Sequence, residues 1–147
     1  MSDEYVLVER SPTVEEHHGL CQAVGWEHVD AEATETGLRN ALFSVCVIHK
    51  DKVIGCGRVV GDGGIYFYIQ DIIVLPEFQG RGFGRCIMDA VMGYLSSHAH
   101  PNAFIGLMAA KGVSRFYEKY GFAERPPAGQ GCSGYGESSA TLPLLPR

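Results

Sequence analysis

The sequence has no long hydrophobic run. No stretch of it approaches the roughly 20 uncharged apolar residues that cross a bilayer. The first ten residues include the charged Asp3, Glu4, Glu9 and Arg10, so they lack the apolar core of a secretory signal peptide. We therefore expect a protein without a membrane partner and with a cytoplasmic location.

Paired cysteines are missing as well. The five cysteines lie at Cys21, Cys46, Cys56, Cys86 and Cys132, an odd number with no two close together. This spacing fits neither a disulfide framework nor a zinc ribbon, and the histidines are scattered. We expect buried or free thiols and no bound metal.

Positive charge is in short supply. Twelve Lys and Arg residues stand against 17 Asp and Glu residues, which gives a net charge of −5. This balance opposes loose binding to nucleic acid or to an anionic membrane surface. We expect no nucleic-acid partner, whereas a cationic substrate is compatible with the charge.

Glycine, by contrast, is abundant, with 19 residues against an average share of roughly 7 %. The glycines have no period, and 46 % of the residues are apolar, so collagen and low-complexity disorder are excluded. A chain of this length buries roughly 70 % of its extended surface on folding. Because no repeat or linker divides the sequence, residues 1–147 are expected to form one domain.

The spacing of apolar residues predicts strands that alternate with helices. Thr13 and Glu16 have the spacing of a capping box at the start of the first helix, and a break is expected in the second helix near Gly37. The stretch 66–74 is apolar on both faces, which indicates a central strand. The expected strands are 5–10, 43–49, 53–60, 66–74, 103–109 and 140–145, and the expected helices are 13–24, 30–40, 82–98 and 113–120, with a loop over 125–139.

The segment 71–85, DIIVLPEFQGRGFGR, runs from an apolar strand into a glycine-rich helix start. A helix N-terminus presents unpaired N–H groups and the positive end of a dipole, and the glycines at 80, 82 and 84 leave that backbone open to an anion. Arg81 and Arg85 add positive charge. The segment lacks the ending of a P-loop and has Arg85 where a dinucleotide fingerprint needs glycine. Phosphate binding of another kind is predicted, with a tight connection as the alternative for the glycines alone.

Two motifs follow one another in the second half of the chain. Residues 79–84 read Gln-Gly-Arg-Gly-Phe-Gly, and residues 116–122 read Phe-Tyr-Glu-Lys-Tyr-Gly-Phe. They resemble the Gln/Arg-x-x-Gly-x-Gly/Ala signature and the Phe-Tyr-x-x-x-Gly-Phe segment of the Gcn5-related N-acetyltransferase (GNAT) family. The resemblance covers roughly residues 40–123. It implies an α/β fold, in which helices flank a mixed and largely antiparallel sheet.

The resemblance also implies how acetyl-CoA, the cosubstrate of the family, would bind. Its pyrophosphate would lie on the backbone N–H groups of 79–84, and its pantetheine arm would pair with the central strand beside a β-bulge. Ala110 stands where the family often has an asparagine that bonds the pantetheine. The expected cofactor-binding residues are Ile72, Ile73, Val74, Gln79, Gly80, Arg81, Gly82, Phe83, Gly84, Arg85 and Tyr117.

Tyr117 matches the family tyrosine that donates a proton to the departing CoA thiolate. Without that match, Tyr117 reads as a core tyrosine on an apolar helical stripe. Asp71 is the only carboxylate on the central strand and is the candidate base, with a structural hydrogen-bonding partner as the alternative. Strand alternation places Asp71 on the face opposite Tyr68 and Gln70.

The acceptor side of the expected site is assigned to Trp26, Tyr68 and Gln70. Core packing is the alternative for Trp26. The expected activity is direct transfer of acetyl from acetyl-CoA to a primary amine of a small molecule, without a metal. A protein or peptide acceptor and a non-catalytic acyl-CoA sensor are the alternatives. The sequence leaves open which amine is acetylated and whether the chain forms a homodimer.

Overall fold

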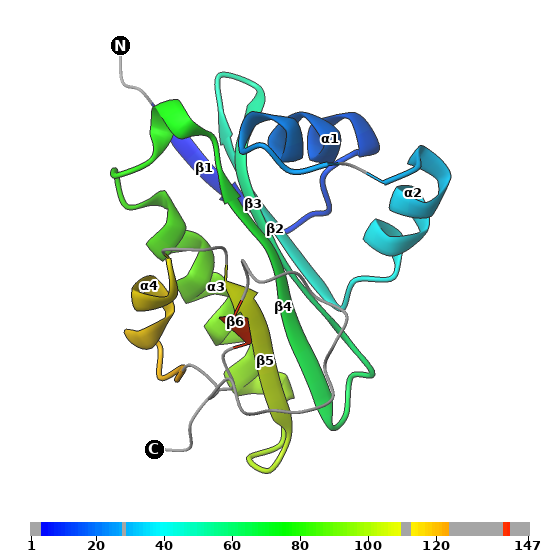
Figure 1. The fold of residues 1–147 in the computed structure, drawn as a ribbon, viewed down its shortest axis with the longest axis vertical. Helices are drawn as coiled ribbons and strands as arrows, with labels where there is room; N and C mark the ends of the chain where they lie inside the picture. Colours follow the sequence, from blue (N-terminus) through cyan, green and yellow to red (C-terminus); the bar gives the residue numbers. More distant parts are fainter. Residues whose placement is uncertain (1–3, 28, 110–112, 124–139, 142–147) are drawn as a thin grey trace.

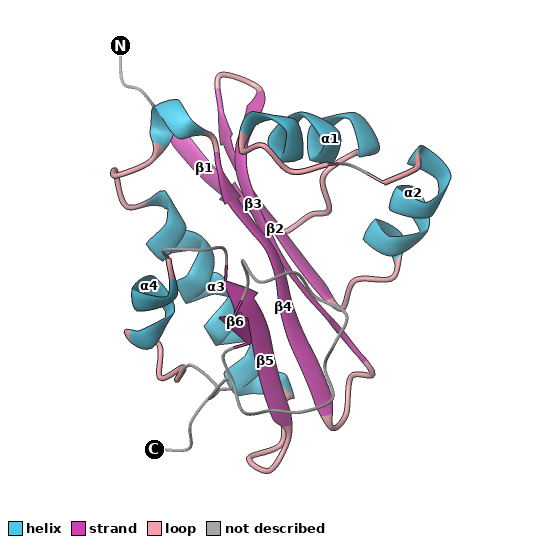
Figure 2. Ribbon diagram, in the orientation of Figure 1, coloured by secondary structure: helices cyan, strands magenta, loops and turns pink. Residues whose placement is uncertain are grey.

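The computed structural model describes residues 4–27, 29–109, 113–123 and 140–141. Six strands form one sheet in sequence order, antiparallel throughout except where β4 and β5 run parallel (Figures 1 and 2). The strands are β1 (Tyr5–Val8), β2 (Phe43–His49), β3 (Lys52–Gly61), β4 (Tyr66–Val74), β5 (Phe104–Ala109) and β6 (Ala140–Thr141). The helices are α1 (Val14–Ala23), α2 (Ala31–Arg39), the 3-10 turn η1 (Pro76–Phe78), α3 (Phe83–His98) and α4 (Ser114–Glu118). The mixed, largely antiparallel α/β fold is therefore confirmed.

The helices cover both faces of the sheet (Figure 1). α1 and α2 lie together on one face, and α3 crosses the other face against β2, β3 and β4. Apolar side chains on both sides of the sheet are removed from water, and this burial is the main stabilising contribution. The most deeply buried side chains are Leu20, Val45, Ile54, Val59, Phe67, Ile73, Ile87, Met88, Val91, Leu95 and Leu107. Within the described residues, no helix has the length and apolar character needed to cross a bilayer.

Local signals in the sequence fix most element boundaries. The expected capping box is present, because the Glu16 backbone N–H donates to Thr13 Oγ1 at 3.1 Å and the Thr13 N–H donates to Glu16 Oε1 at 2.8 Å. Glu16 also pairs with Arg10, which lies beyond the end of β1 rather than inside it. Of the expected strand 140–145, the structure describes only Ala140–Thr141, and the expected loop 125–139 and Ala110 lie outside the described residues.

The expected break at Gly37 is wrong, since α2 continues through this residue to Arg39. The Asp30 carboxylate caps the helix by accepting from the N–H groups of Glu32 and Ala33, and Leu38 is buried on its inner face. A single interior glycine costs a helix only about 1 kcal/mol relative to alanine. The cap and the buried face outweigh that cost.

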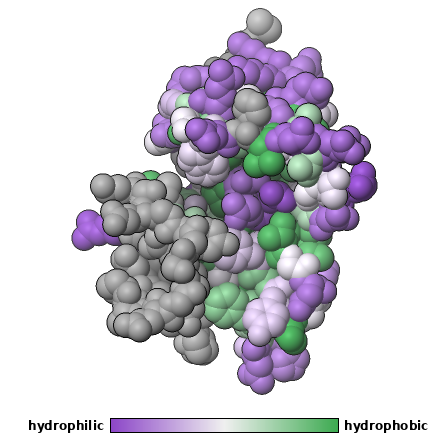
Figure 3. Space-filling model, turned by 45° about the vertical axis from the view of Figure 1, so that its right-hand side comes forward, coloured by the Kyte–Doolittle hydropathy of each residue, from purple (hydrophilic) through white to green (hydrophobic). Residues whose placement is uncertain are grey.

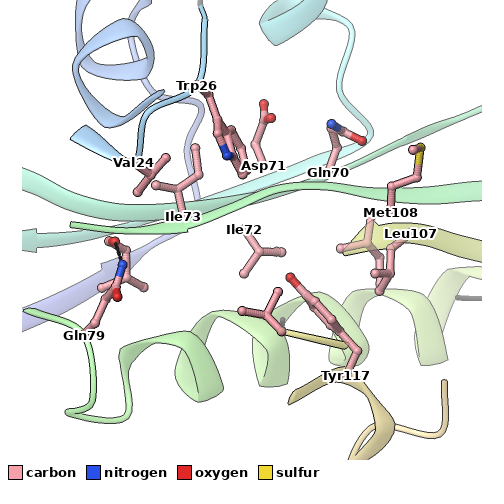
Figure 4. A pocket seen from close by; sticks show the side chains of 13 residues that line it. Val24, Trp26, Gln70, Asp71, Ile72, Ile73, Gln79, Leu107, Met108 and Tyr117 are labelled. Carbon is pink, nitrogen blue, oxygen red and sulfur yellow. Dashed lines mark hydrogen bonds between the residues drawn. The ribbon is translucent and has the colours of Figure 1, made fainter. Parts of the chain in front are cut away.

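A β-bulge interrupts the central strand. Arg58 pairs with Gln70 and Cys56 pairs with Ile73, so Gly57 alone lies opposite two residues, Asp71 and Ile72. Asp71 has the left-handed φ of 56°, which few non-glycine residues adopt. The bulge turns the Asp71 side chain to the same face of the sheet as Gln70, and the alternation expected from the sequence is therefore wrong (Figure 4).

The bulge coincides with a separation of β4 from β5. β5 pairs with β4 only over Tyr66–Ile69, and its last two residues pair with β6 instead. Among the described residues, no strand pairs with Gln70–Val74 on the β5 side. A strand edge of this kind can pair with an extended ligand.

Gly57 brings α3 close to the bulge. A Cβ at Gly57 would lie 2.5 Å from Cγ2 of Ile87 and 2.8 Å from Cδ1 of Ile72, which is closer than van der Waals contact. Ile87 is fully buried, and its Cγ2 branches from Cβ, so this neighbour has little room to move. The absence of a side chain at this position therefore sets the distance between helix and sheet.

We expect Gly57→Ala to lower the free energy of unfolding by about 1–3 kcal/mol, because overpacking forces neighbouring side chains from their rotamers. Gly93→Ala is the matched control, since a Cβ at this exposed position of α3 meets nothing within 4 Å. That substitution should raise stability by up to about 1 kcal/mol. Urea denaturation of both variants measures the difference, and equal effects would contradict the packing argument.

Candidate functional site

A cavity of about 230 Å³ lies where β4 separates from β5 (Figure 4). It receives residues from the loop after α1, from both strands and from α4. On the surface, hydrophilic side chains cover α1 and α2, whereas hydrophobic side chains gather below them over the sheet (Figure 3). The cavity is lined by Val24, Trp26, Ile69, Gln70, Asp71, Ile72, Ile73, Val74, Gln79, Leu107, Met108, Val113 and Tyr117.

Asp71 is held by two charged or polar neighbours on the α1 side of the sheet. Arg58 Nε donates to Asp71 Oδ2 at 2.7 Å, and His17 Nε2 lies 2.8 Å from the same oxygen. Because an ionised carboxylate only accepts, His17 Nε2 carries the proton of this bond. Burial raises the pKa of the Asp71 carboxyl, but the His17 hydrogen bond and the Arg58 charge outweigh it and hold that pKa below its ordinary value. Asp71 is thus an ionised carboxylate at neutral pH.

The sequence offered two roles for Asp71, a catalytic base and a structural hydrogen-bonding partner. The residue is a structural hydrogen-bonding partner at the bulge, and it also lines the cavity. Its side chain is 9 % exposed. A carboxylate with a lowered pKa is a weak base but a strong hydrogen-bond acceptor.

Tyr117 enters the cavity from α4, on the opposite side of β4 from Asp71 (Figure 4). The residue is 7 % exposed, and its hydroxyl points toward Ile72. Burial raises the pKa of the Tyr117 phenol to about 12, so the group remains protonated at neutral pH. No described residue accepts a hydrogen bond from this hydroxyl, and it is therefore available as a donor inside the cavity.

Of the three residues that the sequence assigns to the acceptor, two line the first cavity. Trp26 and Gln70 line the cavity, and the indole lies beside the Asp71 carboxylate (Figure 4). The Trp26 backbone N–H donates to the Cys21 carbonyl at 2.9 Å, which fixes the loop at the end of α1. Tyr68 is not among the lining residues, because it lies two positions before Gln70, where β4 is still paired with β5.

The glycine loop forms a second cavity of about 360 Å³. It shares Val74 and Gln79 with the first, and the Gln79 amide donates to the Val74 carbonyl at 2.9 Å. Gly80 and Gly82 have left-handed φ values of 76° and 88°, which open the loop at the start of α3. The other lining residues are Phe78, Gly80, Gly82, Phe83, Gly84, Arg85, Phe116, Lys119 and Tyr120.

The two sequence motifs meet at this second cavity. A Cβ at Gly84 would lie 3.3 Å from Cζ of Phe116, so the third glycine of the loop lets α4 pack against α3. Arg85 and Lys119 both line the cavity and supply positive charge. The sequence analysis did not predict Lys119 as a binding residue. Its position inside the second motif would have indicated this role only if the two motifs had been known to lie in contact.

The side chain of Arg81 is directed elsewhere. Its guanidinium lies 5.8 Å from the centre of the Tyr5 ring and 5.6 Å from that of Phe78. Tyr5 in turn stacks on His49 with ring centres 4.3 Å apart. Arg81 thus ties the loop to the β1 edge by cation–π contacts, and of the two arginines only Arg85 lines the cavity.

Other lining residues also lay outside the prediction. Val24, Leu107, Met108 and Val113 are apolar residues that pattern alone assigns to the core. They reach the cavity only because β4 and β5 diverge. No sequence signal distinguishes a residue at such a fork from one in a closed sheet.

Comparison with known proteins agrees with this geometry. The family described as "Acetyltransferase (GNAT) domain" matches residues 40–124. A protein of unknown function from meticillin-resistant Staphylococcus aureus, whose crystal structure is solved, has 35 % sequence identity and a TM-score of 0.81, with 91 % of this chain and 99 % of that chain covered.

Two relatives are named for their acceptors. Serotonin N-acetyltransferase 2, chloroplastic, from Oryza sativa subsp. japonica is 34 % identical over 84 residues, 57 % of this chain and 41 % of the rice protein. A histone acetyltransferase from Glycine max is 26 % identical over 162 aligned positions, 92 % of this chain and 69 % of the soybean protein. With a family match over more than half of its length and both motifs at one pair of joined cavities, the chain belongs to the GNAT family of acetyltransferases.

Proposed function

We propose that the protein transfers acetyl from acetyl-CoA to a primary amine of a small molecule, by direct attack while both are bound. The observation that carries this proposal is the junction of the two cavities at Val74 and Gln79. A CoA whose pyrophosphate lies on the glycine loop can extend past this junction along the unpaired edge of β4. Its thioester then lies between Tyr117 and Asp71.

The reaction needs few groups. The lone pair of the amine attacks the thioester carbon, a C–N bond forms, and the C–S bond breaks. The amine loses one proton, and the CoA sulfur leaves as a thiolate that gains one. Unpaired backbone N–H groups of β4 beside the bulge are suited to polarise the thioester carbonyl during attack.

Tyr117 is assigned to the departing sulfur. A phenol with a pKa of about 12 is a weaker acid than a thiol with a pKa of about 8.5, so full proton transfer between them costs about 5 kcal/mol. Tyr117 therefore stabilises the thiolate by a hydrogen bond, and water supplies the proton. This role needs a protonated hydroxyl in the cavity. Burial keeps the Tyr117 hydroxyl protonated because it raises the pKa, and the position of Tyr117 on α4 places it in the cavity.

A small acceptor is favoured over a protein by the size of the acceptor side. The named relatives include both kinds, a serotonin and a histone acetyltransferase, so they do not decide between them. The first cavity measures about 230 Å³, which is below the roughly 300–1,000 Å³ of pockets that hold a whole drug-sized ligand. It fits the acetyl end of the donor and a compact amine.

The test of the proposed function is thiol release from acetyl-CoA with a panel of primary amines and a peptide with a free lysine. Turnover with a small amine supports the proposal. Turnover with the peptide alone supports the alternative acceptor, and binding of acetyl-CoA without turnover of any amine supports a non-catalytic sensor.

The glycine loop gives a prediction about acetyl-CoA binding. Acetyl-CoA at 100 times its Kd should stabilise the protein by about 2.7 kcal/mol. Gly82→Glu places a negative charge at the start of α3 and should abolish this gain. Gly82→Ala is the control, because both variants carry the strain of a left-handed φ, about 1–2 kcal/mol, and only one carries the charge. Thermal shifts measure the effect, and equal gains in the two variants would refute the phosphate assignment.

Tyr117→Phe tests the leaving-group assignment. The substitution keeps the ring that packs against Phe116 and removes only the hydroxyl. We expect kcat to fall by about 10²–10³-fold, with little change in the KM for acetyl-CoA, since the hydrogen bond strengthens only as the thiolate forms. Tyr94→Phe, on α3 and outside both cavities, is the control and should retain wild-type kcat. A fully active Tyr117→Phe variant with rate-limiting chemistry would make Tyr117 a packing residue.

A further inference from the structure

We propose that the acceptor is a primary amine on a compact, otherwise uncharged body, apolar or aromatic, without a carboxylate and without a second ammonium. The inference rests on the proposed function and narrows its acceptor class. It excludes free amino acids and polyamines, both of which are common small primary amines. The inference is based on the charged residues that line the first cavity and on the hydrogen bonds of Asp71.

The two carboxylate oxygens of Asp71 have different surroundings. Oδ2 accepts from both Arg58 Nε and His17 Nε2. No described residue donates to Oδ1, although Asp71 lines the cavity. Oδ1 can therefore accept an N–H of the acceptor amine and orient its lone pair toward the thioester.

The charge of Asp71 is already balanced. Arg58 forms an ion pair with it at 2.7 Å, so the pair is close to neutral as a unit. A neutral pair orients one N–H group but has no excess negative charge for a second ammonium. A diamine or polyamine would bring another cation into a site where no described lining residue is a further carboxylate.

A carboxylate on the acceptor likewise finds no cationic partner among the described residues of the first cavity. The described lining residues include no lysine, arginine or histidine. Arg58 does not line the cavity, and its charge is already paired with Asp71. Removing an unpaired ion from water opposes binding strongly, so an amino acid should be rejected by its α-carboxylate.

The walls around Asp71 suit an apolar body. Trp26 presents its indole beside the carboxylate, Val24 and Ile73 lie on the same side, and Met108 closes the far end (Figure 4). The face of an indole also attracts the positive edge of an aromatic ring, and it attracts an ammonium group. Gln70 lies between Asp71 and Met108 and can hydrogen-bond an uncharged polar group on the body (Figure 4).

Matched pairs of amines test the charge rule. We expect kcat/KM, expressed per unprotonated amine, to be at least about 100-fold higher for 2-phenylethylamine than for phenylalanine. Phenylalaninamide keeps the α-substituent without its charge and should lie within about tenfold of 2-phenylethylamine. Pentylamine should likewise exceed 1,5-diaminopentane by about tenfold or more. Phenylalaninamide as slow as phenylalanine would mean exclusion by shape and would overturn the inference.

Substitution at Met108 tests the same rule from the protein side. Met108→Arg adds a cation on the wall away from Asp71 and should lower the 2-phenylethylamine to phenylalanine ratio about tenfold or more. Met108→Gln, of similar length and uncharged, should leave the ratio unchanged. The KM for acetyl-CoA and the circular dichroism spectrum verify that both variants fold, and an unchanged ratio in a folded Met108→Arg would contradict the inference.

Trp26→Ala tests the apolar wall. The KM for 2-phenylethylamine should rise about tenfold, whereas the KM for acetyl-CoA should not change. If amino acids or 1,5-diaminopentane prove to be the best acceptors, the acceptor class is wrong and the proposed function stands. If acetyl-CoA binds but no small amine is acetylated, the proposed function itself fails, and the acceptor class fails with it.

Discussion

The site depends on one local distortion, the β-bulge at Asp71. In the register that pairs Tyr66 with Phe104, an unbroken β4 would place Gln70 and Asp71 against the last two residues of β5 and narrow the space in which the cavity lies. The bulge puts two residues opposite Gly57 and bends the strand, and no described strand pairs with Gln70–Val74 on the β5 side. A non-glycine residue with a φ of 56° is strained, and the two hydrogen bonds to Asp71 Oδ2 hold it in place. The hydrogen bonds from His17 and Arg58 that stabilise the bulge therefore also position Asp71 in the wall of the first cavity.

A second constraint joins the donor side to the same strand. The glycine loop follows directly on β4 through η1, and Gly84 lets Phe116 pack at the start of α3. Tyr117, next to Phe116, is thereby carried to the cavity while its neighbour supports the loop. Arg81 fastens the outer side of the loop to Tyr5 and Phe78. The glycine loop and Tyr117 are thus positioned by one packed unit.

The features of this structure that depend on short-range sequence signals could be predicted from the sequence. Capping at Thr13, the central position of β4 and the glycines of the loop are short-range signals, and the structure has them where they were predicted. The face of Asp71 was wrong, because a bulge is set by pairing with a distant strand and breaks the period of two. The continuity of α2 through Gly37 depends on the burial of Leu38 as well as on the local cap at Asp30, and the direction of Arg81 depends in part on Tyr5, which is distant in the sequence. The family resemblance implied a β-bulge in the central strand, but apolar spacing does not show where β4 and β5 part.

The ionisable groups of the cavity point to a particular division of labour. Tyr117 has a pKa of about 12, and the Asp71 carboxyl has a pKa below its ordinary value, so neither group readily completes a proton transfer near neutral pH. In the proposed reaction, Tyr117 acts as a hydrogen-bond donor and Asp71 as a hydrogen-bond acceptor. The proposal therefore has the net proton from the amine and the net proton to the sulfur exchanged with water. What the protein supplies is orientation of the two reactants and fixed dipoles around the developing charges, which is where most of the rate enhancement of such a transfer arises.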